Sequence, residues 1–346
     1  MSLNILDLVR PNVLKMEPYS SARDEFKEGK GVFIFLDANE SPIDNGINRY
    51  PDPNQIKLKE VISKRKGINS NQLLLGNGSD EVLDLIFRAF CEPNTDNIIT
   101  LPPTYGMYSV LANLNAIENR EVLLDSNFEP NVEGILDAID AQTKIIFLCS
   151  PNNPTGNTFS RERIEKILSS FRGLVVIDEA YIDFSEKESW LTKLESYPNL
   201  IICQTLSKAY GMAGLRIGSL FASSSIISIL NKIKPPYNIN VLSQEKAFEE
   251  LLNKNKFNNT ITSIKEEKNI LIKVLLEVNF VKKVYTSDTN YLLIEVDDAL
   301  KRYDQLLKNG IVVRNRSSQP LCSNCLRISI GTKEENSKLI QIIKQL

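Results

Sequence analysis

Short stretches of continuously apolar residues alternate with helical patterns over the middle of this chain, and this alternation constrains the fold more than any other feature. The apolar stretches predict strands at residues 73–75, 97–100, 121–124, 144–149, 174–177, 200–205 and 216–221. Between them, the spacing of apolar residues predicts helices at 53–66, 80–90, 105–114, 132–139 and 160–169. Strands that are apolar on both faces and separated by helices predict a mainly parallel seven-stranded sheet with helices on both sides, which is an α/β fold.

The pattern changes after two consecutive prolines, Pro235 and Pro236. A long helix rich in lysine and glutamate is expected at 243–276, followed by strands at 290–296, 310–314 and 326–330 and by helices at 299–307 and 334–346. Before the large sheet, the sequence predicts a short helix, a strand at 32–36 and an extended arm. We therefore expect a large domain over 48–238 and a smaller α+β domain formed by 239–346 together with the arm, 1–47.

The composition argues against several classes of partner. With 41 basic and 43 acidic residues the net charge is -2, which gives no reason to expect a nucleic acid or an anionic membrane surface. The first residues lack the basic start and long apolar run of a signal peptide, and the sequence contains no apolar run long enough to span a membrane. We therefore expect a cytoplasmic protein.

The chain contains no histidine and five cysteines. Without histidine, Ser-His-Asp and Cys-His nucleophile systems are excluded, so lysine, carboxylates, tyrosine or a cofactor must move any proton. Cys91, Cys149 and Cys203 lie in apolar stretches and are expected to be reduced, buried thiols. Cys322 and Cys325 form a single C-x-x-C motif, and without a second pair we expect no metal site.

A lysine follows the strand expected at 200–205. Lys208 stands between Ser207 and a glycine-rich turn that leads into the next strand. Ligands of parallel α/β sheets bind beyond the carboxyl ends of the strands. An amine that is held and desolvated there is a nucleophile for an aldehyde such as pyridoxal phosphate. A solvated surface lysine fits this stretch alone equally well, so the neighbouring strand ends must decide.

Three other strand ends carry residues suited to the phosphate or the ring of such a cofactor. Gly76-Asn-Gly-Ser-Asp80 opens a helix after the first strand, where backbone N–H groups and Ser79 would bind a phosphate. Tyr105 follows the second strand in a proline turn and could stack on a flat ring, while Asn153 lies in a rigid loop and could donate a hydrogen bond. An N-cap turn, a core aromatic and a local turn are the structural alternatives at these three places.

The fifth and sixth expected strands end in charged residues. Asp178 follows a buried strand, where a carboxylate is costly unless it meets a cation such as a protonated pyridine nitrogen. Tyr181 could donate to the phenolate oxygen of the same ring, although a capping aspartate with a packed tyrosine is the alternative. Ser207 and Arg216 lie on either side of Lys208 and could both reach a phosphate. Together, these groups on one edge of one sheet favour a pyridoxal phosphate site.

Several longer motifs resemble those of one enzyme family. Asn153-Pro-Thr-Gly156, Asp178-Glu-Ala-Tyr181 and Ser207-Lys-Ala-Tyr-Gly-Met-Ala-Gly-Leu-Arg-Ile-Gly218, in this order, resemble the class II pyridoxal-phosphate aminotransferases of fold type I. The segments 37–42, 49–53, 76–81 and 324–331 narrow the resemblance, which covers nearly the whole chain, to the histidinol-phosphate aminotransferases. It implies an enzyme of histidine biosynthesis that exchanges an amino group between L-histidinol phosphate and 2-oxoglutarate.

The resemblance also implies a role for each matching residue. Lys208 would hold pyridoxal 5'-phosphate as a Schiff base and then shuttle the proton of the substrate α-carbon, while Asp178 would pair with the pyridinium. The other cofactor contacts would come from Tyr181 and Asn153 at the phenolate oxygen, Tyr105 on the ring, Ser79, Asp80, Ser207 and Arg216 at the phosphate, and Tyr50 of the partner subunit. A shared phosphate site of this kind implies a homodimer.

For the substrates, the resemblance assigns Arg327 to the anionic end of both, with Arg314, Tyr19 and Asn39 lining the pocket. Arg316 lies next to these residues and receives no role. A threonine-phosphate decarboxylase, or an aminotransferase for aromatic or other amino acids, would share the cofactor motifs, and the sequence does not separate them. A cofactor-binding transcriptional regulator would need a DNA-binding domain and a basic patch, which the sequence does not show.

Overall fold

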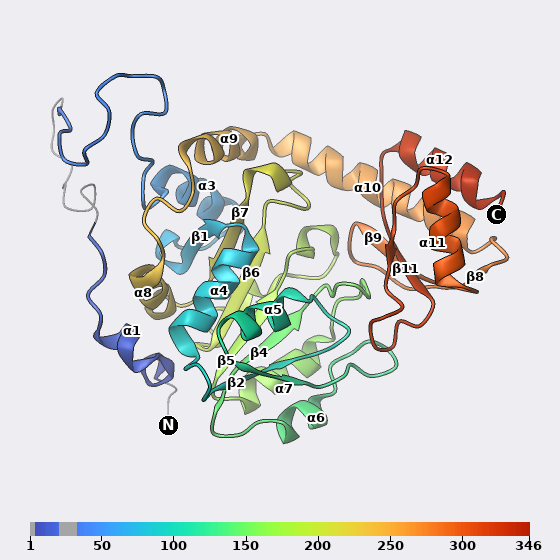
Figure 1. Cartoon of the computed structure of the whole chain (residues 1–346), viewed down its shortest axis with the longest axis horizontal. Coiled ribbons are helices and arrows are strands. Elements are labelled where there is room, and N and C mark those ends of the chain that lie inside the picture. Colours follow the sequence, from blue (N-terminus) through green and yellow to red (C-terminus); the bar gives the residue numbers. More distant parts are fainter. Residues whose placement is uncertain (1–3, 21–32) are drawn as a thin grey trace.

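The computed structural model describes residues 4–20 and 33–346, and a seven-stranded sheet forms its centre (Figure 1). The spatial order of the strands is β1-β7-β6-β5-β4-β2-β3. β7 runs antiparallel to both of its neighbours, whereas β6, β5, β4, β2 and β3 pair in parallel. The predicted seven-stranded, mainly parallel sheet is therefore confirmed. Its strands are β1 (Leu73–Asn77), β2 (Asn97–Thr100), β3 (Glu118–Glu121), β4 (Thr143–Cys149), β5 (Leu174–Asp178), β6 (Leu200–Thr205) and β7 (Ile217–Phe221).

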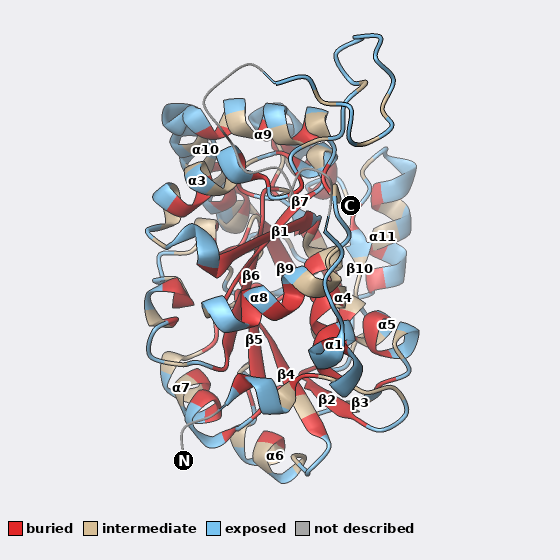
Figure 2. Cartoon of the chain, turned by 90° about the vertical axis from the view of Figure 1, so that its left-hand side faces the viewer, coloured by how far each residue is buried: buried red, intermediate tan, exposed pale blue. Residues whose placement is uncertain are grey.

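Helices cover both faces of this sheet. Because side chains alternate along a strand, Val175 and Ile177 of β5 join one core cluster, and Leu174 and Val176 join the cluster on the opposite face. Figure 2 shows the central strands in the buried colour, with the exposed faces of the helices turned outward. The first cluster includes residues of α3 (Ile56–Lys66), α6 (Val132–Asp137), α7 (Arg161–Ser170) and α9 (Val241–Leu252), and the second includes residues of α1 (Pro11–Lys15), α4 (Ser79–Phe90), α5 (Met107–Leu114) and α8 (Ser224–Ile233).

A four-stranded antiparallel sheet lies beside the large one, with the order β10-β11-β9-β8. On one face, Leu326 and Ile328 of β11 are buried with residues of three helices. On the other face, Cys325 of β11 and Leu293 of β9 join a core cluster of the large sheet. The small sheet therefore packs against the large one. Its elements are α10 (Lys254–Leu275), β8 (Val281–Val284), β9 (Tyr291–Val296), α11 (Ala299–Lys308), β10 (Arg314–Asn315), β11 (Cys325–Ser329) and α12 (Lys333–Ile343).

Two segments assigned to the smaller domain pack on the large sheet instead. The apolar residues Ile5, Val9 and Val13, in and beside the 3-10 helix η1 (Ile5–Leu8) and α1, are buried in the α4 and α8 cluster. The side chain of Arg10 holds this segment in place by binding Glu92 and the carbonyl oxygen of Arg88. Helix α9, which begins after residue 238, is likewise buried in the large-sheet core. The division into two domains stays a prediction, and in this chain the first described residues pack on the large sheet.

Three secondary-structure predictions also need correction. The helix expected at 243–276 is two helices, because the side chain of Asn253 accepts a hydrogen bond from the N–H of Lys256 and starts α10 after α9 has ended. Residues 33–36 form no strand, and the side chains of Ile34 and Leu36 are exposed, while residue 32 lies outside the described residues. The strand predicted at 121–124 lies at 118–121, because β3 is an edge strand of polar residues that an apolar pattern does not detect.

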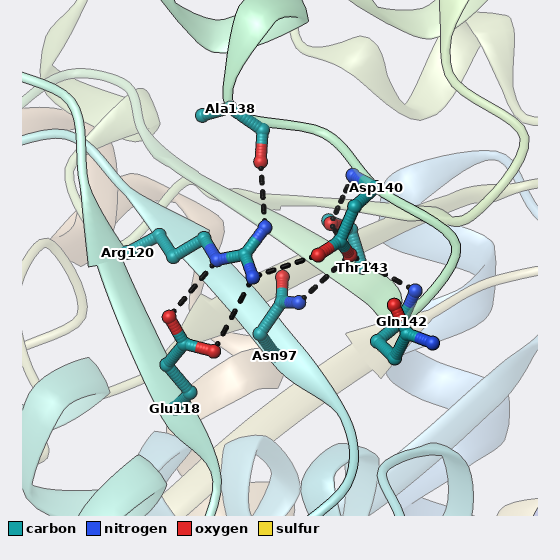
Figure 3. A network of polar contacts seen from close by, with 7 residues as sticks. All are labelled: Asn97, Glu118, Arg120, Ala138, Asp140, Gln142 and Thr143. Carbon is teal, nitrogen blue, oxygen red and sulfur yellow. Dashed lines mark hydrogen bonds and ion pairs between the residues drawn. The ribbon is translucent and has the colours of Figure 1, made fainter.

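A polar network fixes the outer edge of the sheet, at the opposite end of β2 from the residues singled out above (Figure 3). Arg120 on β3 binds Glu118, Asp140 and the carbonyl oxygen of Ala138, and Asp140 also accepts a hydrogen bond from Asn97 on β2. The hydrogen bond from Asn97 has the largest effect on Asp140. Together with the hydrogen bonds from Arg120, Gln142 and Thr143, it holds the pKa of Asp140 well below its usual range. The network ties β2, β3 and the end of α6 together.

The remaining 3-10 helices are short connections: η2 (Ser70–Gln72), η3 (Ile182–Phe184), η4 (Trp190–Lys193) and η5 (Ala213–Leu215). Helix η5 lies in the loop that joins β6 to β7. The same loop contains Lys208 and therefore belongs to the site. Thr205 at the end of β6 pairs with Gly218 at the start of β7. This loop therefore leaves and re-enters the sheet at neighbouring positions.

Candidate active site

The residues selected from the sequence meet at one edge of the large sheet. β1, β2, β4, β5 and β6 all end there, and β7 begins there because it runs in the opposite direction. Asp178 is the last residue of β5, Lys208 lies three residues beyond β6, and Arg216 directly precedes β7. Parallel pairing thus brings together side chains that are far apart in the sequence.

Asp178 is a buried carboxylate with two hydrogen bonds and no ion pair to any described residue. Its side chain accepts hydrogen bonds from the hydroxyl of Tyr108, at 2.8 Å, and from the backbone N–H of Ala180, at 3.1 Å. Burial raises the pKa of Asp178 to about 6, although both hydrogen bonds act in the opposite direction. A buried carboxylate of this kind is stabilised by a cationic ligand, so Asp178 fits the protonated ring nitrogen of pyridoxal phosphate.

Tyr108 is a residue of the site that sequence reasoning missed. Its side chain is fully buried, stacks on Phe147 at 4.9 Å between ring centroids and meets Tyr105 edge-on at 5.6 Å. A buried tyrosine within an apolar helix pattern suggests a core aromatic, which hides its role as the donor to Asp178. The available signal was its position three residues after Tyr105, since residues at this spacing lie on the same face of a helix.

Two backbone segments approach each other closely and form a cradle at the start of α4. A Cβ atom on Gly218 would lie 2.4 Å from the backbone nitrogen of Ser79, and one on Gly78, whose φ is +85°, would lie 2.5 Å from a guanidinium nitrogen of Arg216. Both glycines are therefore needed to bring the helix terminus and the arginine together. Free N–H groups at a helix start beside a guanidinium suit a phosphate.

The other phosphate and ring residues border this cradle. The hydroxyl of Tyr105 donates to Asp80 at 3.0 Å, and Asp80 lies 3.8 Å from the guanidinium of Arg216. The hydroxyl of Thr205 donates to that of Ser207 at 3.0 Å and accepts from the Ser207 N–H at 3.1 Å. The guanidinium of Arg216 and the hydroxyl of Ser207 are both able to donate to an anion, so they fit the phosphate of the cofactor.

The amine of Lys208 lies beside the ring of Tyr181, with 5.8 Å between the Nζ atom and the ring centroid. Desolvation lowers the pKa of Lys208, the charge of Arg327 lowers it further, and Asp178 opposes both. A lysine with a lowered pKa has a larger fraction of neutral, nucleophilic amine. Lys208 is exposed to solvent in this chain, and its lowered pKa suits it to react with an aldehyde.

Arg327 on β11 closes the site from the small sheet. Its guanidinium donates a hydrogen bond to the side-chain oxygen of Asn153 and lies 5.1 Å from the ring centroid of Tyr291. The hydroxyl of Tyr291 donates to the carbonyl oxygen of Asn152 at 2.6 Å, and its ring meets Tyr181 edge-on. The small sheet is thereby joined to the loop after β4 and to the tyrosine after β5.

Three predicted residues lie apart from this cluster. Asn39 and Tyr50 line a hollow of about 510 Å³ between the arm and the start of α9, where the ring of Tyr50 stacks on that of Tyr237 at 4.5 Å. Tyr19 is exposed. Residues 33–47 of the arm extend away from the body of the chain in Figure 1. A single chain therefore does not bring these three residues to Lys208.

Other features bear on alternative chemistry. Within residues 4–20 and 33–346, no group of three or more cysteine, aspartate or glutamate residues is placed to hold a metal ion. All five cysteines, including Cys322 and Cys325, are free and buried. No helix in the same residues is both long and apolar enough to cross a membrane.

Comparison with known proteins identifies the family. The sequence model of the aminotransferase class I and II family matches residues 24–343. The chain belongs to this family. The histidinol-phosphate aminotransferase of Flavobacterium johnsoniae is 62% identical over 346 residues, which cover 100% of this chain and 99% of that protein.

Solved aminotransferase structures share the fold. The histidinol-phosphate aminotransferase from Clostridium acetobutylicum matches with a TM-score of 0.80 and 26% identity, covering 86% of this chain and 90% of that chain. That of Sinorhizobium meliloti, solved in complex with pyridoxal-5'-phosphate, matches with a TM-score of 0.77 and 22% identity over 86% of this chain and 83% of that chain. The fold type I architecture expected from the motifs is confirmed. Class I and II aminotransferases depend on pyridoxal phosphate, so the predicted cofactor is confirmed as well.

Proposed function

We propose that this protein is a pyridoxal-phosphate-dependent aminotransferase that transfers the amino group of L-histidinol phosphate to 2-oxoglutarate, in histidine biosynthesis. The observation that carries the proposal is the placement of Asp178, a buried carboxylate with no ion pair to any described residue, near Lys208, whose pKa is lowered. Arg327 of the small sheet lies on the same site. The high identity to histidinol-phosphate aminotransferases over the full chain supports this choice of substrates.

The cofactor, when bound, supplies an aldehyde carbon for amines and a ring that accepts the electrons left on a substrate carbon after proton loss. Asp178 keeps a proton on the ring nitrogen, and the hydroxyl of Tyr108 holds the carboxylate in position. The Nζ atom of Lys208, when it is not bonded to the cofactor, would remove the proton of the substrate α-carbon. Its lowered pKa suits this task, because a general base works best when its pKa lies near the working pH.

The remaining side chains orient the cofactor. The N-terminus of α4 with Ser79 and Asp80, together with Ser207 and Arg216, binds the phosphate. The hydroxyl of Tyr181 donates to the phenolate oxygen of the ring.

Asn153 and Tyr105 contact the ring of the cofactor, and two arginines bind the substrates. The side-chain oxygen of Asn153 already accepts from Arg327, which leaves its amide N–H₂ group to donate to the same ring oxygen. Tyr105, held by its hydrogen bond to Asp80, stacks on the ring. Arg327 binds the anionic end of both substrates, with Arg314 beside it.

A second subunit completes each site in this proposal. Tyr50, Tyr19 and Asn39 lie on or near the arm, away from Lys208 in their own chain. In a homodimer, the partner's Tyr50 reaches the cofactor phosphate. Mixing subunits tests this directly: Lys208→Ala and Tyr50→Ala are each expected to be inactive, and refolding them together is expected to restore activity, because one site of the mixed dimer keeps both residues. Unchanged inactivity of the mixture would reject shared sites.

The substrate is tested by single-turnover reactions of the cofactor-loaded protein with three amino compounds. L-histidinol phosphate is expected to convert the cofactor to its amino form rapidly, and 2-oxoglutarate is expected to reverse the conversion. Release of carbon dioxide from threonine phosphate would instead indicate a decarboxylase. Rapid conversion by phenylalanine, with none by histidinol phosphate, would indicate an aminotransferase for aromatic amino acids.

A further inference from the structure

The side chains of three arginines at the edge of the small sheet lie on the same face of that sheet. Arg314 on β10 lies directly opposite Arg327 on β11, and the backbone N–H of Arg316 continues the pairing by donating to the carbonyl oxygen of Cys325 at 2.8 Å. Because side chains alternate along paired strands, Arg314, Arg316 and Arg327 share one face. The opposite face, with Leu326, is buried under helices, so the arginine face is the one turned to the large sheet.

Arg316 lacks partners for its charge. Its Nε atom is buried without a hydrogen-bond partner, and so is the Nε atom of Arg327. In the part of the chain that the structure describes, no ion pair joins Arg314, Arg316 or Arg327 to a carboxylate. Desolvation lowers the pKa of Arg316, and the charges of Arg327 and Arg314 lower it further. Such a cluster is costly unless an anion binds to it.

The charge of Arg316 is directed toward the active site. Burial raises the pKa of the Tyr181 hydroxyl, and the charges of Arg327 and Arg316 both oppose this rise. Tyr181 lies beside Lys208. Arg316 is thus close enough to the reacting groups to act on a substrate there, yet the cofactor phosphate already has Arg216 and the α4 terminus. Because the proposed function assigns the cofactor phosphate to Arg216 and the start of α4, the candidate partner of Arg316 is a substrate anion.

We propose that Arg316 binds the phosphate end of the amino donor together with Arg327 and Arg314, and that it selects a doubly charged phosphate over a singly charged carboxylate at that end. This inference rests on the proposed function for the identity of the donor. A phosphate dianion has three oxygens and nearly two charges, so it engages several guanidinium groups, whereas one arginine suffices for a carboxylate. Arg316 is then needed for the donor and is dispensable for 2-oxoglutarate.

The two half-reactions of one enzyme provide the test. Arg316→Gln in the cofactor-loaded protein is expected to lower kcat/KM for histidinol phosphate by about 10- to 100-fold, the usual effect of losing a hydrogen-bonded charge. The rates with unphosphorylated L-histidinol and with 2-oxoglutarate are expected to change by less than about threefold. Arg172→Gln, at an exposed turn, is the matched control and is expected to behave as wild type.

Binding of inorganic phosphate separates this inference from the proposed function. With the cofactor in place, phosphate is expected to inhibit competitively, and about tenfold more weakly after Arg316→Gln. If the wild-type protein did not accept histidinol phosphate, the proposed function would fail, and the phosphate inhibition measured with any active donor would still test Arg316. Arg316→Lys is expected to fold and to recover part of the affinity, because an ammonium cannot bind two oxygens side by side. Equal losses with all substrates, or unchanged phosphate inhibition, would overturn the inference.

Discussion

Replacing Asp178 with asparagine is expected to stabilise the cofactor-free protein while it destroys activity. The folded chain holds the proton of Asp178 more tightly than the unfolded chain does, because burial raises the pKa from 3.8 to about 6. Ionised Asp178 therefore lowers the free energy of unfolding at neutral pH. Since a tenfold change in an acid constant is worth about 1.4 kcal/mol, the full penalty is about 3 kcal/mol. Asparagine has nearly the same shape without the charge.

The pH dependence follows from the same numbers. The stabilising effect of Asp178→Asn is expected to be absent near pH 3, where the carboxyl is protonated in both the folded and the unfolded chain. It grows as the pH rises, to about 1.5 kcal/mol at pH 5 and about 3 kcal/mol at pH 7, and is constant above that. Tyr108 does not prevent the exchange, because its hydroxyl can rotate to accept a hydrogen bond from the asparagine amide.

Urea unfolding of the two cofactor-free proteins at pH 5 and pH 7 measures these differences. Asp304→Asn on the exposed face of α11 is the control and is expected to change the free energy of unfolding by less than about 0.5 kcal/mol at either pH. Adding pyridoxal phosphate is expected to stabilise the wild type more than the variant, because only the carboxylate gains a cation. A variant that is no more stable than wild type, or equally more stable at both pH values, would contradict the reasoning.

Three further substitutions test other parts of the structure. Lys208→Ala is expected to abolish both transamination and the absorbance that the cofactor gains on binding this lysine, and a coloured, active variant would reject the assignment. Gly218→Ala would place a methyl group 2.4 Å from the backbone nitrogen of Ser79, so we expect the cradle to open and cofactor affinity, measured by titration, to fall at least about tenfold; unchanged affinity would show that the close approach is unimportant. Asn253→Ala removes the acceptor for the N–H of Lys256 at the start of α10 and is expected to lower the free energy of unfolding by about 1 kcal/mol without changing kcat/KM, which urea unfolding and steady-state assays measure.

The large sheet could be predicted because its strands are buried on both faces. β2 and β6 lie at the predicted residues, 97–100 and 200–205, because a short, mostly apolar run is typical of a strand that is buried on both faces. The rule that ligands bind at the carboxyl ends of parallel strands then selected Asp178 and Lys208 before any contact was known. The predicted position of β3 is wrong because β3 is an edge strand with polar side chains, which an apolar pattern does not detect.

Other parts of the site depend on information that a local pattern does not carry. The role of Tyr108 comes from a contact across the sheet with Asp178, seventy residues later in the chain. The roles predicted for Tyr50, Tyr19 and Asn39 stay predictions, because they involve a second subunit. The break at Asn253 depends on one side-chain hydrogen bond inside an otherwise continuous helical pattern, which outweighs the pattern locally.

Lys208 and Arg216 lie in one loop, and the pairing of Thr205 with Gly218 fixes both ends of this loop in the large sheet. The two ends cannot separate without breaking that sheet. The arginines proposed to recognise the substrate lie in or next to β10 and β11 of the small sheet. The residues proposed to hold the cofactor and those proposed to recognise the substrate therefore lie on two separate sheets, which meet where the guanidinium of Arg327 donates a hydrogen bond to Asn153.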